Sequence, residues 1–323
     1  MEEKRVRPEA FDIARSMLIL NQFDELCRLA DGLCVVVPLK GISLLRSLYS
    51  ERFDRAVGDI DLLISPADRL GPYVERLQQC GYRLQFDFMR NASTRSRKGK
   101  VALCAAAPHL TVDVDLHTAF VTKKFFSRSV ARFNADALQR CRVESANLCI
   151  MESLDEWLFL AQHACFHQYS DPKWLRDLDL LSRAMSSDDW SALEDRAREY
   201  GFGRLFYLTS LRLQTETSSF PHPLPRLDGA SLFRRFVARY SPAAASAPAR
   251  KLSKLFWEFL FIDRFKARLQ AYGALLLPTP SLLRNIYRTD NSLLVVVLYP
   301  LHLLLSLVAL LLFAPYYLLR GLI

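Results

Sequence analysis

Two runs of alternating acidic and apolar residues are the part of this sequence best suited to chemistry. The first is Asp59-Ile-Asp-Leu-Leu-Ile64. Because side chains alternate between the two faces of a strand, Asp59 and Asp61 share one face and the apolar residues point to the core. Their Cβ atoms are then about 6.6 Å apart, which is twice the strand rise of about 3.3 Å per residue. Two carboxylates at this spacing can converge on metal ions.

The second run lies in a predicted strand over 110–117, where Asp113, Asp115 and His117 share one face. Aspartate is depleted in strands, and neighbouring carboxylates repel each other unless they are protonated or neutralised by a cation. A divalent ion is the simplest neutraliser. Oxygen ligands without nearby cysteine or paired histidine favour Mg²⁺ or Mn²⁺ over zinc. The alternative is that each run is a solvated strand face with incidental acids.

A short turn, Pro38-Leu-Lys-Gly41, has the features of a phosphate-binding turn. It is predicted to end a strand and open a helix, so unpaired backbone N–H groups and the positive end of a helix dipole meet there. Gly41 permits a ligand to approach the backbone closely, and Lys40 supplies a positive charge. A Lys-Gly pair is also common in ordinary turns, so this turn is informative only together with the acidic runs.

Hydrophobic periodicity indicates the elements that position these residues. Helices are predicted over 9–31, 42–49 and 66–81, and strands over 34–38, 59–64, 82–86, 101–106 and 110–117. From about residue 150 the apolar period becomes helical, beginning with the capping box Ser153-Leu-Asp-Glu156.

These elements predict the α+β fold class. Five segments are expected: an N-terminal helical segment (1–32), an α+β domain (33–150), a helical domain (151–240), a basic aromatic helical region (251–290) and a transmembrane helix (291–319).

Composition excludes several classes of protein. The chain has 323 residues, of which 51% are hydrophobic, and its net charge is +9, so it is neither disordered nor of low complexity. Its seven cysteines contain no Cys-x-x-Cys pair, which argues against a disulfide scaffold and against a zinc knuckle. The N-terminal residues lack the basic and hydrophobic blocks of a secretory signal. We therefore expect the bulk of the chain in the cytosol.

The C-terminal part differs, because residues 291–319 contain no charged side chain. Roughly 20 apolar residues suffice to span a bilayer, so a single-pass anchor is predicted there, with a buried core helix as the alternative. Arg284 and Arg288 precede this segment, which favours the cytoplasmic face of the inner or plasma membrane for the preceding domains. Basic and aromatic residues mix over 251–290, and that region is predicted to contact anionic lipid, with ordinary helix packing as its alternative.

Three motifs occur in an order that resembles the uncharacterised nucleotidyltransferases of the polymerase-β-like superfamily. They are Leu39-Lys-Gly41, Gly58-Asp-Ile-Asp-Leu-Leu63 and Val114-Asp-Leu-His117, with Tyr49 and Arg55 between the first two. The resemblance covers about residues 33–215. It implies a polymerase-β-like mixed sheet and the in-line transfer of a nucleoside monophosphate from an NTP to a hydroxyl group. In such a site Asp59 and Asp61 bind two metal ions, and Asp115 binds one of them and helps to deprotonate the acceptor.

The resemblance also implies a set of phosphate ligands. The Gly-Ser turn that is usual in the wider superfamily reads Lys40-Gly41 here, so Lys40 and Gly41 are expected to contact phosphate, with Ser43 as a substitute hydroxyl. Arg55 is expected to be a phosphate or structural partner of the acidic strand.

The resulting expectation is a membrane-tethered, Mg²⁺- or Mn²⁺-dependent nucleotidyltransferase. A non-catalytic membrane-associated scaffold that retains the fold is one alternative, and a toxin- or antitoxin-type nucleotidyltransferase is another. The acceptor is open: a protein hydroxyl, a sugar, a lipid head group or an RNA end. Nucleic acid is the less favoured partner, because the basic run over 90–100 is predicted to be a solvated loop. His163 and His167 share a helix face but lack the glutamate of a zinc-protease motif, so helix packing is expected there.

Overall fold

The computed structural model describes residues 10–49, 55–84, 100–106, 111–121, 128–217 and 220–224, and, further along, residues 280, 283, 284, 289, 291–305 and 307. The chain forms two compact units. The first comprises 1–122 and 132–159, and the second comprises 123–131 and 160–323.

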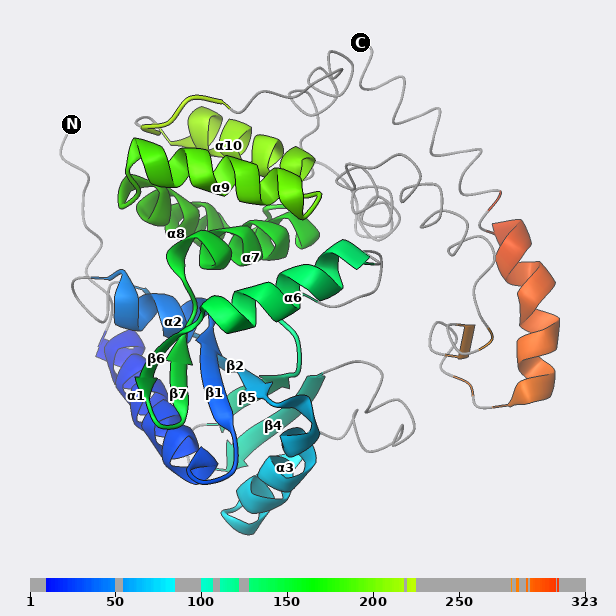
Figure 1. The fold of residues 1–323 in the computed structure, drawn as a ribbon. Coiled ribbons are helices and arrows are strands. Elements are labelled where there is room, and N and C mark those ends of the chain that lie inside the picture. Colours follow the sequence, from blue (N-terminus) through cyan, green and yellow to red (C-terminus); the bar gives the residue numbers. More distant parts are fainter. Residues whose placement is uncertain are drawn as a thin grey trace. The chain divides into compact units, whose positions relative to one another are not determined.

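The first unit is built on a mixed sheet, whose seven described strands have the order β3-β4-β5-β2-β1-β7-β6 (Figure 1). β2 runs parallel to β5 and β1 runs parallel to β7, whereas the other neighbours are antiparallel. The strands are β1 (Val35–Leu39), β2 (Asp59–Ser65), β3 (Tyr82–Leu84), β4 (Lys100–Ala106), β5 (Thr111–His117), β6 (Arg142–Ser145) and β7 (Leu148–Ile150). The predicted mixed sheet is therefore confirmed.

Up to residue 224 the described helices agree broadly with the helical periods of the sequence, except that no helix was predicted over 128–140. They are α1 (Ala10–Ala30), α2 (Lys40–Ser47), α3 (Leu70–Gln79), α6 (Arg128–Arg140), α7 (Ser153–Phe166), α8 (Pro172–Arg183), α9 (Ser187–Glu199) and α10 (Gly203–Glu216). One 3₁₀ turn (Ala67–Arg69) precedes α3. α2 begins directly at the end of β1, as the phosphate-turn hypothesis requires.

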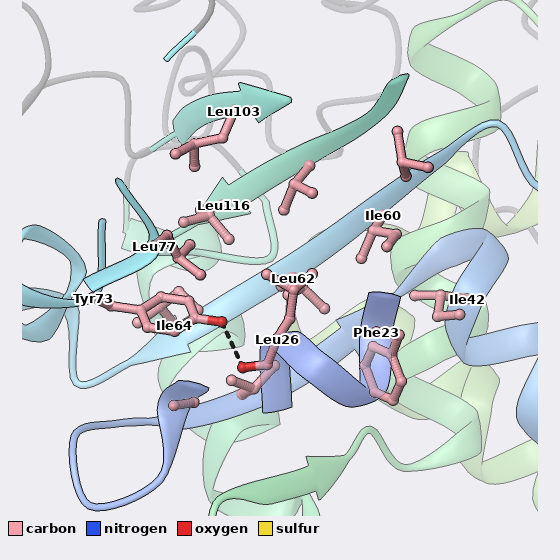
Figure 2. Packing of buried hydrophobic residues seen from close by; sticks show 14 of the residues in the cluster. Phe23, Leu26, Ile42, Ile60, Leu62, Ile64, Tyr73, Leu77, Leu103 and Leu116 are labelled. Atoms are coloured by element: carbon pink, nitrogen blue, oxygen red, sulfur yellow. Dashed lines mark hydrogen bonds between the residues drawn. The ribbon is translucent and has the colours of Figure 1, made fainter. Parts of the chain in front are cut away.

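The apolar face of β2 builds the core of the first unit. Ile60, Leu62 and Ile64 are at most 1% exposed and pack with α1 and α3 (Figure 2). The Tyr73 hydroxyl of α3 donates a hydrogen bond of 2.8 Å to the Leu26 carbonyl of α1, which ties the two helices together. Burying each such aliphatic side chain contributes about 1.5–3 kcal/mol. This packing determines which face of β2 turns inward, and it leaves the aspartates on the other face.

The hairpin of β6 and β7 lies between 117 and about 150, a stretch for which the sequence predicts no strand. All four residues of β6 are exposed, and β7 has only three residues. A strand without a buried face shows no apolar alternation, so it leaves no periodic signal in the sequence.

The second unit is helical in its described part. Asp171 caps α8 by accepting a hydrogen bond of 3.0 Å from the Lys173 amide, and Pro172 occupies the first turn. α9 begins with a capping box of Ser186 and Asp189. Local sequence therefore determines where both helices start.

The described part of the C-terminal segment is a helix over 292–305. Leu293, Val296 and Val297 are 78%, 71% and 61% exposed. Among the described residues, none of the helices is both long enough and apolar enough to cross a bilayer. Residues 308–319 of the predicted span lie outside the described residues, as do the basic run 90–99 and nearly all of the region 251–290.

Candidate metal and phosphate site

β2 and β5 are neighbouring parallel strands, and their register places the two acidic runs side by side. Asp59 pairs with Asp113, and Asp61 pairs with Asp115. The same register places Leu63 beside His117. Because facing residues of neighbouring strands point to the same side of the sheet, the two acidic runs form one surface.

Three side chains on this surface can hold a metal ion together. Each of Asp61, Asp115 and His117 offers a ligand atom, and these atoms lie within 4.8 Å of one another. Asp61 is 2% exposed and His117 is 8% exposed, while Asp115 is partly buried. This buried group, which we name the metal cluster, is the one such group of three among the described residues.

Asp59 lies outside the metal cluster, although it was expected to bind metal with Asp61 and Asp115. It is the first residue of β2 and is exposed, as is its partner Asp113. The structure thus brings together two of the three expected carboxylates and adds His117. The sequence held a signal for His117, since period-two alternation puts it on the acidic face.

Asp61 has two close nitrogen partners. Lys40 Nζ donates a hydrogen bond of 2.6 Å to Asp61 Oδ1, and His117 Nε2 lies 2.9 Å from the same oxygen. Burial is the strongest influence on Asp61 and disfavours its charged form. The hydrogen bond from His117 and the charge of Lys40 outweigh burial and hold the pKa of Asp61 well below its usual range. An ionised carboxylate only accepts hydrogen bonds, so in this arrangement Asp61 can accept one from Nε2 of His117.

The position of Lys40 follows from the antiparallel pairing of β1 with β2. Leu39 is the register partner of Asp61, so the next residue enters α2 beside the acidic strand. Lys40 adopts a positive φ of 53°, a region that non-glycine residues rarely occupy. The sharp turn brings its ammonium group back to Asp61.

The first turn of α2 has no side-chain cap and no acidic residue, although Gly41, Ile42 and Ser43 are buried. Backbone N–H groups at the start of a helix lack intrahelical partners, and the helix dipole favours negative charge there. The local structure therefore suits a phosphate group.

Gly41 lets a buried cation approach this turn. A Cβ atom at Gly41 would lie 2.6 Å from Nη1 of Arg55 and 3.2 Å from Cγ1 of Val57. Arg55 is only 7% exposed, so its guanidinium group has little room to move away. A side chain at position 41 would therefore have to displace the end of Arg55 and press on Val57.

Ser43 is 1% exposed, and its hydroxyl has no hydrogen-bond partner among the described residues. A buried polar atom without a partner costs about 1–3 kcal/mol, which makes Ser43 a group that a ligand can satisfy.

The paired histidines of the sequence are found in ring packing instead of in the metal cluster. The ring centroids of His163 and His167 are 4.7 Å apart, and Trp174 lies 5.3 Å and 5.1 Å from them. This arrangement agrees with the expected helix packing.

Comparison with known proteins gives one family. A family model described as an uncharacterised nucleotidyltransferase matches residues 9–215 of the chain. No curated protein and no solved structure matches it. The matched range includes the metal cluster, the Lys40-Gly41 turn and Arg55.

Proposed function

The chain belongs to this family of uncharacterised nucleotidyltransferases, and we propose that it is a metal-dependent enzyme that transfers a nucleoside monophosphate from an NTP to a hydroxyl acceptor. The observation that carries the proposal is the metal cluster of Asp61, Asp115 and His117, which lies next to the uncapped first turn of α2, where Lys40 contacts Asp61. Carboxylates for metal ions and a positive turn for phosphates are the two requirements of such a reaction.

We propose a polymerase-β-like arrangement for the sheet. It is supported by the Asp-x-Asp strand β2, which follows the Lys40-Gly41 turn and lies parallel to the later acidic strand β5. In this arrangement Asp59 completes the ligand set of Asp61 and Asp115 from the exposed end of β2.

The donor set fits Mg²⁺ or Mn²⁺. Two carboxylates within 4.8 Å of each other suit hard divalent ions, and the imidazole of His117 adds a nitrogen donor that Mn²⁺ accepts more readily than Mg²⁺ does. When bound, such ions neutralise the charge that develops on the attacking and leaving oxygens of an in-line displacement.

The residues of the phosphate turn bind and orient the nucleotide. The unpaired N–H groups of α2 donate to phosphate oxygens, and Lys40 and Arg55 offset the charge of the triphosphate. The acceptor oxygen attacks the α-phosphorus, the bond to the β-phosphate oxygen breaks, and pyrophosphate leaves. Asp115, which is only partly buried, takes the proton of the acceptor hydroxyl.

The test is label transfer by the full-length protein. Each of the four α-labelled NTPs is incubated with cell extract and Mg²⁺ or Mn²⁺, and transferred label is identified as protein, sugar, lipid or RNA. We expect transfer by the wild type and none by a variant that carries both Asp61→Asn and Asp115→Asn. A folded wild type that neither binds metal–NTP nor transfers label would instead be the non-catalytic scaffold.

We further propose that the C-terminal helix attaches the enzyme to a lipid surface, with a membrane-linked acceptor. Exposed leucine and valine side chains over 293–305 support this proposal, as does the absence of charge over 291–319. The full chain should float with anionic vesicles, whereas a chain that ends at residue 290 should not. Equal recovery of both chains in the vesicle-free fraction would contradict the proposal.

A further inference from the structure

We propose that Lys40 is a tethered counter-cation, which neutralises Asp61 while no metal is bound and moves to the NTP phosphates when metal binds. This inference rests on the proposed function, and it adds the order of events at the same site. Metal and nucleotide binding become coupled through a single lysine side chain.

The geometry places Lys40 in direct competition with a metal ion. Its Nζ atom lies 2.6 Å from Oδ1 of Asp61, the carboxylate that also contributes to the metal cluster. Asp61 is 2% exposed, so water cannot screen a second positive charge beside the first. A divalent ion at Asp61 therefore repels the Lys40 ammonium group from its present place.

The Lys40–Asp61 ion pair satisfies the charge requirement of a metal-free resting state. A buried carboxylate without a counter-charge is strongly disfavoured, and His117 offers Asp61 a hydrogen bond but no obligatory charge. Lys40 supplies the missing charge. Once a divalent ion neutralises Asp61 instead, the ion pair no longer holds the Lys40 side chain in place.

A phosphate group bound at the start of α2 would offer the Lys40 side chain a second partner within its reach. Lys40 is the first residue of α2, whose N-terminus has no side-chain cap and so suits a phosphate, and its side chain is 19% exposed and can move. A triphosphate at this turn attracts the ammonium group that the metal expels. Each ligand thus improves the affinity of the protein for the other, since coupling between two binding sites is reciprocal.

The first experiment measures Mn²⁺ binding by electron paramagnetic resonance, without nucleotide, in the full-length protein and in Lys40→Met. Removal of the competing cation should tighten Mn²⁺ binding about tenfold if Asp61 is free of Lys40 in about one molecule in ten. Addition of an α,β-methylene NTP analogue should then tighten Mn²⁺ binding more in the wild type than in Lys40→Met.

Arg46→Met is the matched control. It removes a positive charge from the same helix, but the ion-pair partner of Arg46 is Glu144, at 3.3 Å on the exposed side, and not Asp61. Its effect on Mn²⁺ affinity should stay within about twofold, because exposed charges are screened. A tenfold gain in both variants would mean that net charge, and not competition at Asp61, controls metal binding.

Two results distinguish a failure of the proposed role of Lys40 from a failure of the proposed nucleotidyltransferase function. If the wild type binds Mn²⁺ and Lys40→Met binds it equally or more weakly, Lys40 is no competitor and the inference is wrong while the metal site stands. If neither protein binds Mn²⁺, with or without the NTP analogue, both the inference and the proposed function are wrong.

A second measurement uses the wild type and so does not depend on how the variant folds. Brief acetylation followed by mass spectrometry reports how accessible each lysine is. Saturating Mn²⁺ should raise acetylation of Lys40 several-fold, whereas Lys173, whose side chain is 50% exposed and paired with Asp171 in the helical unit, should not change. Unchanged acetylation of Lys40 with bound Mn²⁺ would overturn the inference.

Discussion

Asp61 of β2 and Asp115 of β5 are register partners in a parallel strand pair, so two carboxylates from distant parts of the chain lie side by side on one face of the sheet. Only one of them is fully buried, and that one carries the contacts to Lys40 and His117. The two acids therefore have different environments: Asp61 is buried against Lys40 and His117, and Asp115 is only partly buried.

Single substitutions of the acidic residues should rank in a fixed order. Asp61→Asn and Asp115→Asn should each abolish label transfer, because each removes a member of the metal cluster. Asp113→Asn is the matched control on the same strand and should have a mild effect, since Asp113 is exposed and outside the cluster. The rate of label transfer at saturating NTP, measured for each variant, gives the order of the losses. Equal losses at Asp113 and Asp115 would show that the wrong acid has been assigned.

His117→Ala should change the preference among metals. Loss of a nitrogen donor should weaken Mn²⁺ binding about tenfold or more and Mg²⁺ binding less, because Mg²⁺ prefers oxygen ligands. Isothermal titration calorimetry with each ion measures the ratio of the Mn²⁺ affinity to the Mg²⁺ affinity in the wild type and in the variant. His167→Ala, at an exposed histidine of the helical unit, should leave both affinities unchanged. An equal loss for the two ions would mean that His117 only holds Asp61 in place.

Gly41→Ala should damage both stability and nucleotide binding. The added methyl group would press on Arg55 and Val57, so we expect a loss of about 1–3 kcal/mol in the free energy of unfolding and weaker NTP binding. Urea denaturation and fluorescent-nucleotide titration measure the two effects. Gly71→Ala is the control: a Cβ atom there meets nothing within 4 Å, and alanine should stabilise α3 by about 0.5–1 kcal/mol. Similar effects of both substitutions would contradict the packing described for Gly41.

Alkaline pH should destabilise the first unit through Tyr82. Burial raises the pKa of Tyr82 to about 12; its hydroxyl also accepts a hydrogen bond from Gln22 and faces Glu25. The unfolded chain releases this proton near pH 10, earlier than the folded chain does. The contribution of the protonated Tyr82 hydroxyl to the free energy of unfolding is thus complete below about pH 10 and is lost as the pH rises toward 12.

Urea denaturation at pH 7, 9.5 and 11 checks this prediction against Tyr82→Phe. Other groups titrate in both proteins, so the relevant quantity is the difference between them. The wild type should lose more stability than the variant between pH 9.5 and 11. Parallel curves would show that Tyr82 ionises as easily in the folded protein as in the unfolded chain.

The local structure of this protein was largely predictable from its sequence. Alternation in Asp59-Ile-Asp-Leu-Leu-Ile64 predicted both the strand and its acidic face, because the period of a strand is a property of the backbone alone. The Lys40-Gly41 turn was placed between a strand and a helix for a similar reason, and the family resemblance built on these motifs is confirmed over 9–215.

What the sequence could not decide was which distant residues meet. The metal cluster depends on the parallel register of β2 and β5, and the Lys40–Asp61 contact depends on the antiparallel register of β1 and β2. Register is set by how the whole apolar face packs against α1 and α3, which involves residues far apart in the chain. His117 therefore lies in the metal cluster, Asp59 lies outside it at the exposed end of β2, and Lys40 contacts the carboxylate of Asp61. Which side chains converge is a property of the tertiary fold and not of local periodicity.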